Sequence, residues 1–177
     1  SKLIPQGVSV LTIPQQKVWL VFRNYHLDWQ GQELTQILKR VQQWENAGNH
    51  IQGIQIDFDA KTKHIHQYTL FLSQLRKQLP QHYQLSITGL MDWTNVTNQE
   101  TLNLLNNTID ELVIQTYQGS TTIPNYAAYL KKVSALKLPY KIGIVQHGEW
   151  RRPPKLENDT NFKGYVVFLL RSKPQNN

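Results

Sequence analysis

The chain has no cysteine among its 177 residues. Disulfide bonds, thiolate-ligated metal sites and a cysteine nucleophile are therefore excluded, whereas the cytosol and a bacterial envelope both remain open as locations. No segment approaches the roughly 18–20 consecutive apolar residues that a helix needs to cross a bilayer. We therefore expect no membrane insertion of this segment.

Charged residues are also few, at 18% of the chain, although the net charge is +7. The basic residues are scattered, and their densest groups are the pairs Lys131-Lys132 and Arg151-Arg152. No basic run is interleaved with aromatic residues, so a nucleic-acid partner is not expected. The phosphate-binding patterns G-x-G-x-x-G and G-x-x-x-x-G-K-[ST] are both missing, and the sequence indicates no cofactor.

Apolar segments of strand length alternate with amphipathic segments of helical spacing along most of the chain. Strands are expected at 17–24, within 51–60, and at 83–90, 110–117, 140–147 and 164–170, with a further candidate at Val8–Ile13. Helices are expected at Leu34–Trp44, closed by Gly48, at Ile65–Leu79, stopped by Pro80, at Leu102–Ile109 and at Pro124–Leu136. The length suits a single domain that spans residues 1–177.

Repeated strand–helix units predict an α/β protein with a parallel sheet, either open and doubly wound or closed into a barrel. Polar and aromatic residues follow nearly every strand, as they do at the mouth of a (β/α) barrel: Arg23, Asp57, Asp59, Asp92, Trp93, Gln115, Tyr117, Gln146 and His147. An open sheet would instead gather its ligand at one switch point. We therefore predict a TIM-like (β/α) barrel. Because a complete barrel takes about 250 residues, we expect it to be incomplete or open at the N-terminal strand or strands.

The stretch IQGIQIDFDA, residues 51–60, carries two aspartates on one face of a buried strand. Its apolar residues alternate with Gln55, Asp57 and Asp59, which therefore share the other face. Two carboxylates on an inward face can do acid–base chemistry, because mutual repulsion and partial burial separate their pKa values. The alternative is structural: Asp57 is held by Ser86, Thr88 or a backbone amide, and Asp59 caps the next helix.

The motif GIQIDFD resembles the fourth-strand signature D-G-x-D-x-D-x-E of the family-18 glycoside hydrolases, the chitinase-like barrels. Later segments are similar in the same order: LSITGL to the fifth strand, IQTYQ to the sixth, IGIVQHG to the seventh and GYVVF to the eighth. Asp57 and Tyr117 match the pattern of that family. The departures are Asp59 in place of the general-acid Glu, Gln52 and Gln55 in place of two Asp, Gln118 in place of Asp, and Phe168 in place of Trp.

A closer resemblance is to a bacterial family of unknown function, number 3142. Its members read roughly G-x-x-x-D-x-D, then Leu-Arg-x-x-Leu-Pro, then Leu-Ser-Ile-Thr-x-Leu-x-x-Trp. This chain supplies Gly53, Asp57, Asp59, Leu75-Arg76, Leu79-Pro80, Leu85 to Thr88, Leu90 and Trp93. The similarity extends over residues 17–170 and is most specific within 51–93. Both resemblances imply a TIM-like barrel.

The resemblance to the hydrolases implies a role for several residues. Asp59 is the expected general acid, Asp57 its electrostatic partner, and Tyr117 the residue that holds the reacting carbonyl of the substrate, unless it only fills the barrel. Asp92 is a candidate base. Substrate binding is expected from Asp92, Trp93, Gln115, Gln55, Gln146, Arg23 and Phe168. Trp93 and Trp150 lie in loops, where they stack on sugars or close the top of the core.

No metal site is expected. His64 and His66 are two residues apart on a predicted helix, so they face different sides and cannot easily share one ion. Two aspartates without further ligands make a weak cation site.

Two functions of different classes follow from these patterns. The first is a carbohydrate-active, glycoside-hydrolase-like barrel that acts on or binds a polysaccharide or oligosaccharide at the C-terminal ends of the strands. The second is a non-catalytic glycan-binding or scaffold domain with a degenerate hydrolase site, favoured by Asp59 and the two Gln replacements. A bacterial envelope location, periplasmic or secreted, is expected, with a signal or lipoprotein leader encoded upstream of Ser1.

Overall fold

The computed structural model describes residues 2–5, 10, 12–23, 31–58, 64–90, 98–118, 121–130, 137–153 and 156–168. Seven strands in these ranges form one sheet in the order β1-β2-β3-β4-β5-β8-β9, and all neighbours are parallel. They are β1 (Lys2–Pro5), β2 (Lys17–Arg23), β3 (His50–Asp57), β4 (Gln84–Leu90), β5 (Glu111–Gln115), β8 (Tyr140–Val145) and β9 (Phe162–Phe168). The predicted α/β class and parallel sheet are confirmed.

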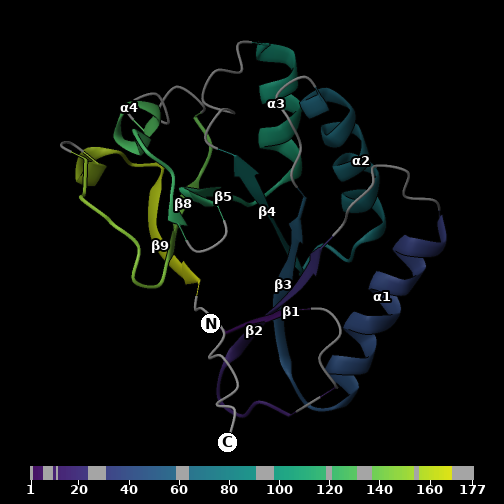
Figure 1. Ribbon diagram of the computed structural model, residues 1–177. Coiled ribbons are helices and arrows are strands. Elements are labelled where there is room, and N and C mark those ends of the chain that lie inside the picture. Colours follow the sequence, from purple (N-terminus) through teal and green to yellow (C-terminus); the bar gives the residue numbers. More distant parts are fainter. Residues whose placement is uncertain are drawn as a thin grey trace, which may run out of the picture.

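Helices connect most of these strands. They are α1 (Gly31–Asn46), α2 (Ile65–Gln78), α3 (Gln99–Thr108) and α4 (Tyr126–Leu130), with a 3-10 helix at Leu156–Asn158. Figure 1 shows α1, α2 and α3 along the convex side of a curled sheet, with α4 on the opposite flank near β8. No helix in the described ranges is long and apolar enough to cross a membrane.

The main core lies between the sheet and the helices. Alternate side chains of the strands, such as Ile54 and Ile56 of β3, are fully buried in it. The predicted helix faces pack against them, and their buried members are Leu34, Ile37, Val41 and Trp44 of α1 and Ile65, Tyr68, Leu72 and Leu75 of α2. Because side chains alternate along a strand, the remaining strand positions face the concave side.

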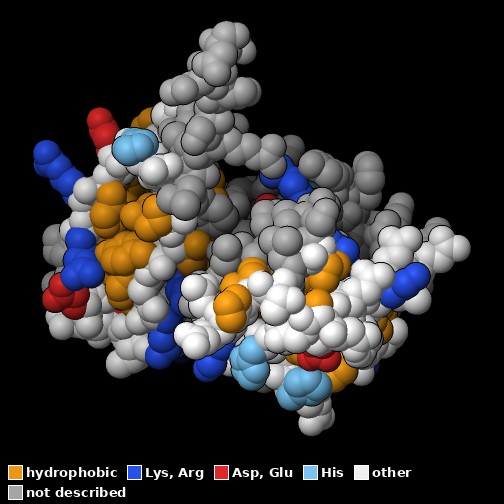
Figure 2. Space-filling model, turned by 90° about the horizontal axis from the view of Figure 1, so that it is seen from below, with side chains coloured by type: hydrophobic (Ala, Val, Ile, Leu, Met, Phe, Trp, Pro, Cys, Tyr) orange, Lys and Arg blue, Asp and Glu red, His pale blue; other side chains and the backbone are white. Residues whose placement is uncertain are grey.

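The sheet is a half-barrel rather than a closed barrel. The strand order begins with β1 and ends with β9, and among the described residues no pairing joins these two strands. Figure 2, seen from below relative to Figure 1, shows a hollow near the centre of the molecule with acidic and basic side chains beside it. The predicted incomplete TIM-like barrel is therefore confirmed, with its opening beside the first strand.

Helix ends follow the predicted signals. Gly48 has a φ of +90°, which favours glycine, and its N–H donates to the Glu45 carbonyl at 2.9 Å. Helix α2 ends before Pro80, and the Arg76 guanidinium donates to the carbonyls of Tyr83 at 2.8 Å and Pro80 at 2.9 Å. These bonds fix the turn that leads from α2 into β4.

Three predicted boundaries were wrong or only partly covered. The additional strand lies at Lys2–Pro5, not at Val8–Ile13, since it is paired to Val18–Val21 and the described residues 10, 12 and 13 are not in a strand. The expected strand 110–117 is interrupted at Thr116, and its end forms the short hairpin of β6 (Tyr117–Gln118) and β7 (Thr121–Thr122). Of the helix expected at 124–136, α4 covers Tyr126–Leu130, and 131–136 lie outside the described residues.

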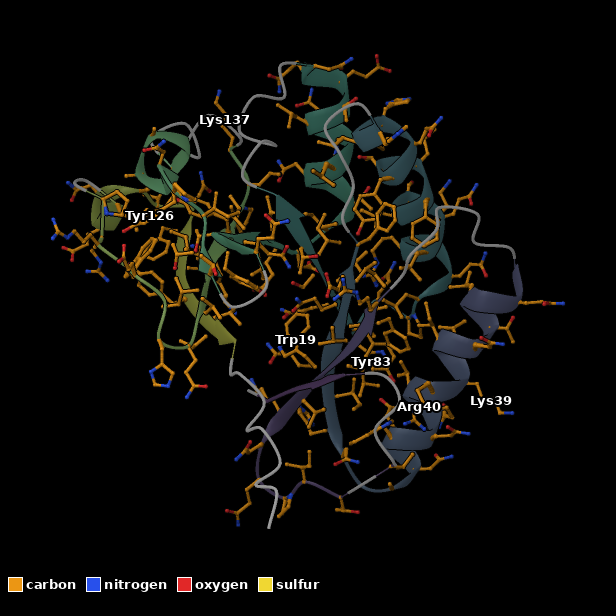
Figure 3. All side chains as sticks on the ribbon, viewed as in Figure 1. Trp19, Lys39, Arg40, Tyr83, Tyr126 and Lys137 are labelled. Atoms are coloured by element: carbon orange, nitrogen blue, oxygen red, sulfur yellow. The ribbon has the colours of Figure 1, made fainter. Side chains whose placement is uncertain are left out.

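Gly53 permits a close approach on the inner side of the sheet. A Cβ atom there would lie 2.2 Å from the Gln84 carbonyl oxygen and 2.8 Å from the Trp19 ring. The Trp19 indole donates to Gln52 Oε1 at 3.1 Å, and Gln52 Nε2 donates to Gln84 Oε1 at 3.1 Å. Figure 3 shows Trp19 on the side of β3 away from α1. The inner side is therefore filled by Trp19 near the strand starts.

We expect Gly53→Ala to lower the free energy of unfolding by about 3 kcal/mol, because backbone atoms of a neighbouring strand would have to move. Gly48→Ala is the matched control: its Cβ has room, at 3.9 Å from Thr12, and only the positive φ opposes it, at about 1 kcal/mol. Urea unfolding of both variants makes the comparison. Equal losses would contradict the close approach at Gly53.

Two tyrosine side chains donate hydrogen bonds to carboxylates of other segments of the chain. Tyr83 donates to Glu45 of α1, and Tyr140 donates to Asp159 Oδ2 at 2.8 Å. Burial raises the pKa of both phenols well above the usual range, and the hydrogen bond and negative charge of each carboxylate raise it further. Both side chains are therefore neutral donors in the folded protein.

We expect the protein to lose stability as the pH rises above about 10, the pKa of an unperturbed tyrosine. Since the pKa of Tyr83 and Tyr140 is raised in the folded state, the unfolded chain releases these protons first, and unfolding becomes more favourable at alkaline pH. The double substitution Tyr83→Phe and Tyr140→Phe should flatten this dependence. Denaturant unfolding at a series of alkaline pH values measures the slope, and an unchanged slope would contradict the assignment.

Candidate functional site

Polar residues end several of the parallel strands at one edge of the half-barrel. Arg23 is the last residue of β2, Asp57 of β3 and Gln115 of β5. Arg23 and Asp57 are register partners, and Gln115 is the partner of Gly143 on β8. The structure therefore brings these three predicted residues to the same edge of the sheet.

Asp57 is held from both neighbouring strands. Thr88 Oγ1 of β4 donates to Asp57 Oδ1 at 3.0 Å, and Arg23 Nη1 of β2 lies 4.0 Å from Asp57 Oδ2. The Asp57 side chain is 20% exposed, whereas that of Arg23 is 58% exposed. The prediction that Thr88 holds Asp57 is confirmed. Asp57 is thus an oriented carboxylate with limited access to solvent.

Ser86, the other predicted partner of Asp57, bonds elsewhere. Its Oγ donates to Glu111 Oε1 at 3.2 Å, and Lys141 Nζ lies 3.1 Å from Glu111 Oε2. The prediction for Ser86 was wrong because Ser86 lies one inward position before Thr88, beside Gln55 and Glu111 rather than Asp57. Glu111 and Lys141 were not predicted. Their signal was the same alternation that points Gln115 inward, continued back to the start of β5.

Gln55 lies on the inner face, two residues before Asp57. It is 2% exposed, and its Nε2 has no hydrogen-bond partner among the residues that the structure describes. A buried amide without a partner costs about 1–3 kcal/mol. Such groups are few in folded proteins, and each calls for an explanation.

Tyr68 of α2 lies near the same carboxylate from the helix layer. Its ring packs on that of Phe58, with centroids 5.0 Å apart. Burial raises the pKa of the Tyr68 phenol well above its usual value, and the negative charge of Asp57 raises it further. The sequence predicted Tyr68 only as part of the apolar helix face. Its closeness to Asp57 depends on how α2 packs against the end of β3, which helical spacing alone does not determine.

Tyr117 does not belong to β5, so the prediction that it ends the same strand as Gln115 was wrong. Strand β5 ends at Gln115, and the next residue, Thr116, still bonds to β8: its N–H and its Oγ1 both donate to the Gly143 carbonyl, at 3.1 and 2.8 Å. Tyr117 then begins β6 and pairs with Thr122. Gln115, Tyr117 and Gln146, which follows β8, are all partly buried. The strand pattern therefore does not determine the direction of Tyr117.

Other predicted residues fall outside this description. Asp59, Asp92 and Trp93 lie outside the described residues, and Phe168 ends β9 as the backbone partner of Val145. The N-cap position of α2 is occupied by His64.

Trp150 packs against other aromatic rings. It stacks on Tyr126 with centroids 5.0 Å apart and meets Tyr165 edge-on at 5.5 Å. These contacts cover the flank of β8 and β9, where Figure 3 places Tyr126. They support the core-closing role of Trp150 over the sugar-stacking one.

His64 and His66 have different surroundings. His66 Nδ1 lies 3.1 Å from Thr101 Oγ1 of α3, and His64 is exposed. In the described ranges, no three His, Asp or Glu side chains are grouped so as to hold a metal ion.

An open half-barrel of parallel strands, with helices outside and polar residues inside, defines the class of this protein as an incomplete TIM-like barrel. The family is identified by comparison. The family model described as Domain of unknown function (DUF3142) matches residues 25–127, and the chain belongs to this family. The predicted family is therefore confirmed.

One solved structure extends the comparison. The crystal structure of the Bacillus cereus spore cortex-lytic enzyme SleL is similar to this chain with a TM-score of 0.51 and 21% sequence identity. The match covers 74% of this chain and 36% of the SleL chain. It supports the predicted likeness to glycoside-hydrolase-like barrels at the level of the fold. A search of curated proteins found no match.

We expect Asp57→Ala to lower the free energy of unfolding by about 2 kcal/mol, because a buried hydroxyl and a guanidinium lose their charged partner. Thr88→Val should lower it by about 1 kcal/mol, since the carboxylate stays partly solvated. Asp59→Ala, at the position expected on the rim, should leave stability nearly unchanged. Thermal melts compare the three variants. A lower melting temperature for Asp59→Ala than for Asp57→Ala would reverse the roles of the two aspartates.

Proposed function

We propose that this domain is a carbohydrate-active, glycoside-hydrolase-like half-barrel that acts on a glycan at the C-terminal edge of its strands. The main support is Asp57, an oriented and partly buried carboxylate at that edge, held by Thr88 and near Arg23. The likeness of the fold to that of a cortex-lytic enzyme makes a cell-wall glycan the first substrate class to examine.

In this proposal Asp59 is the general acid that gives its proton to the glycosidic oxygen as the bond to the sugar breaks. The neighbouring negative charge of Asp57 stabilises the positive charge that develops on the sugar ring. The fixed Thr88 bond supports this role, because it keeps one Asp57 oxygen in place. Water then completes hydrolysis, with Asp92 as candidate base. A separation of about 5 Å between the Asp59 carboxyl group and the second catalytic carboxylate would indicate that the anomeric configuration of the sugar is retained, and a separation of about 6.5–9.5 Å that it is inverted.

A second candidate is a glycan-binding domain without catalysis. Two positions that carry Asp in the hydrolase signature are Gln52 and Gln55 here. Gln52 bonds to Trp19 and Gln84, and Gln55 is a buried neutral amide. Neither can add negative charge beside Asp57, which favours binding over bond cleavage.

A screen with chromogenic glycosides, cell-wall polymers and purified spore cortex separates the two candidates. We expect release of new reducing ends by the wild-type protein and a loss of at least 100-fold in rate for Asp59→Asn, because general-acid catalysis typically contributes about 10²–10⁴-fold. Lys77→Gln, on the exposed end of α2, is the control that should leave the rate unchanged. Binding without turnover in both wild type and Asp59→Asn would instead support the non-catalytic domain.

A further inference from the structure

A row of polar side chains crosses the inner face of the half-barrel, one inward position before Asp57. Gln55 of β3, Ser86 of β4 and Glu111 of β5 are successive register partners. Lys141 of β8 joins them through its ion pair with Glu111. We call these four residues the inner row.

Such a row is unusual at this level of a barrel. Inward positions of closed (β/α) barrels are filled by branched apolar side chains that form a packed core. Here the core lies on the helix side, and the inner row carries an amide, a hydroxyl, a carboxylate and an ammonium group. Partly buried ionic groups are stabilising only when their hydrogen bonds are satisfied. The four side chains of the inner row therefore need hydrogen-bond partners, which the apolar side chains of a packed core do not.

Glu111 is the fixed centre of the row, because Ser86 contacts one of its oxygens and Lys141 the other. The Glu111 side chain is 17% exposed and that of Lys141 is 30% exposed. Solvent thus reaches the Glu111–Lys141 end of the row, whereas Gln55 and Ser86 are buried. An ammonium group has three donors, so the Glu111 pair leaves Lys141 with further capacity to bind an oxygen atom.

Gln55 adds a second donor. Its Nε2 is buried and has no partner in the described part of the chain, which lowers the stability of the folded protein. Gln52, three residues earlier on the same strand, uses both ends of its amide for Trp19 and Gln84. The two glutamines differ in that Gln52 is a structural link and Gln55 is not. Buried polar groups that lack a hydrogen-bond partner in this way are expected mainly at functional sites.

We propose that the inner row is a second sugar-binding subsite, in which Gln55 and Lys141 donate hydrogen bonds to oxygens of a glycan unit on the concave face. This rests on the proposed function and adds a contact surface below the rim, separate from bond cleavage at Asp59. A sugar fits the row because each hydroxyl both donates and accepts. It can therefore satisfy the amide and ammonium donors while bonding to the Glu111 carboxylate.

The test compares two substitutions on one strand, Gln55→Met and Gln52→Met, which both replace the amide by an apolar chain of similar length. For Gln55→Met we expect an unchanged or higher melting temperature and at least five-fold weaker binding of soluble spore-cortex fragments and of β-1,4-linked N-acetylglucosamine oligomers. For Gln52→Met we expect a lower melting temperature and unchanged binding. Calorimetric titration and thermal melts give both readouts.

Lys141→Met is the second variant, and it should also bind at least five-fold more weakly, which decides the matter if Gln55→Met does not fold. If the wild type binds and both inner-row variants bind equally well, the subsite is overturned while the proposed function stands. If the wild type binds neither probe, the proposed function falls and the subsite falls with it. A lower melting temperature with unchanged affinity for Gln55→Met would assign Gln55 a structural role.

Discussion

The alternation of side chains along parallel strands is the constraint on which the other features depend. The helices in Figure 1 cover the convex face of the sheet, so only one set of strand positions can join their core. The other set faces a half-barrel that has no opposing strands in the described order. Some of the polar side chains there, such as Lys141, are partly exposed, and others, such as Gln55 and Ser86, are buried. The open edge and the polar interior are thus two aspects of the same arrangement.

Asp57 illustrates how this arrangement prepares a site. A carboxylate at the end of a parallel strand has neighbours on both sides, and here they are a hydroxyl from β4 and a guanidinium from β2. The hydroxyl fixes orientation through a direct hydrogen bond, whereas the mostly exposed guanidinium contributes a weaker, screened attraction. Orientation of the carboxylate therefore depends on Thr88 more than on Arg23.

The sequence was informative wherever a regular pattern of residues along the chain predicted an element or the side to which a residue points. Helical spacing located α1 and α2, and the Asp57–Thr88 contact followed from strand order and alternation. Non-local pairing was less predictable. Strand β1 exists because it pairs with Val18–Val21, and Tyr117 leaves β5 because it pairs with Thr122 in a separate two-stranded sheet. Glu111 and Lys141 were not predicted, because the predicted site comprised the ends of the strands, while these two residues pair near the strand starts.

The indole of Trp19, which lies over Gly53, makes the two ends of the concave face different. Together with Gln52 and Gln84 it occupies the start of the inner face across β2, β3 and β4. The concave face is therefore closed by side chains at this end over β2, β3 and β4. Under the proposed function, a glycan therefore approaches Asp57 from the rim and not from the starts of these three strands.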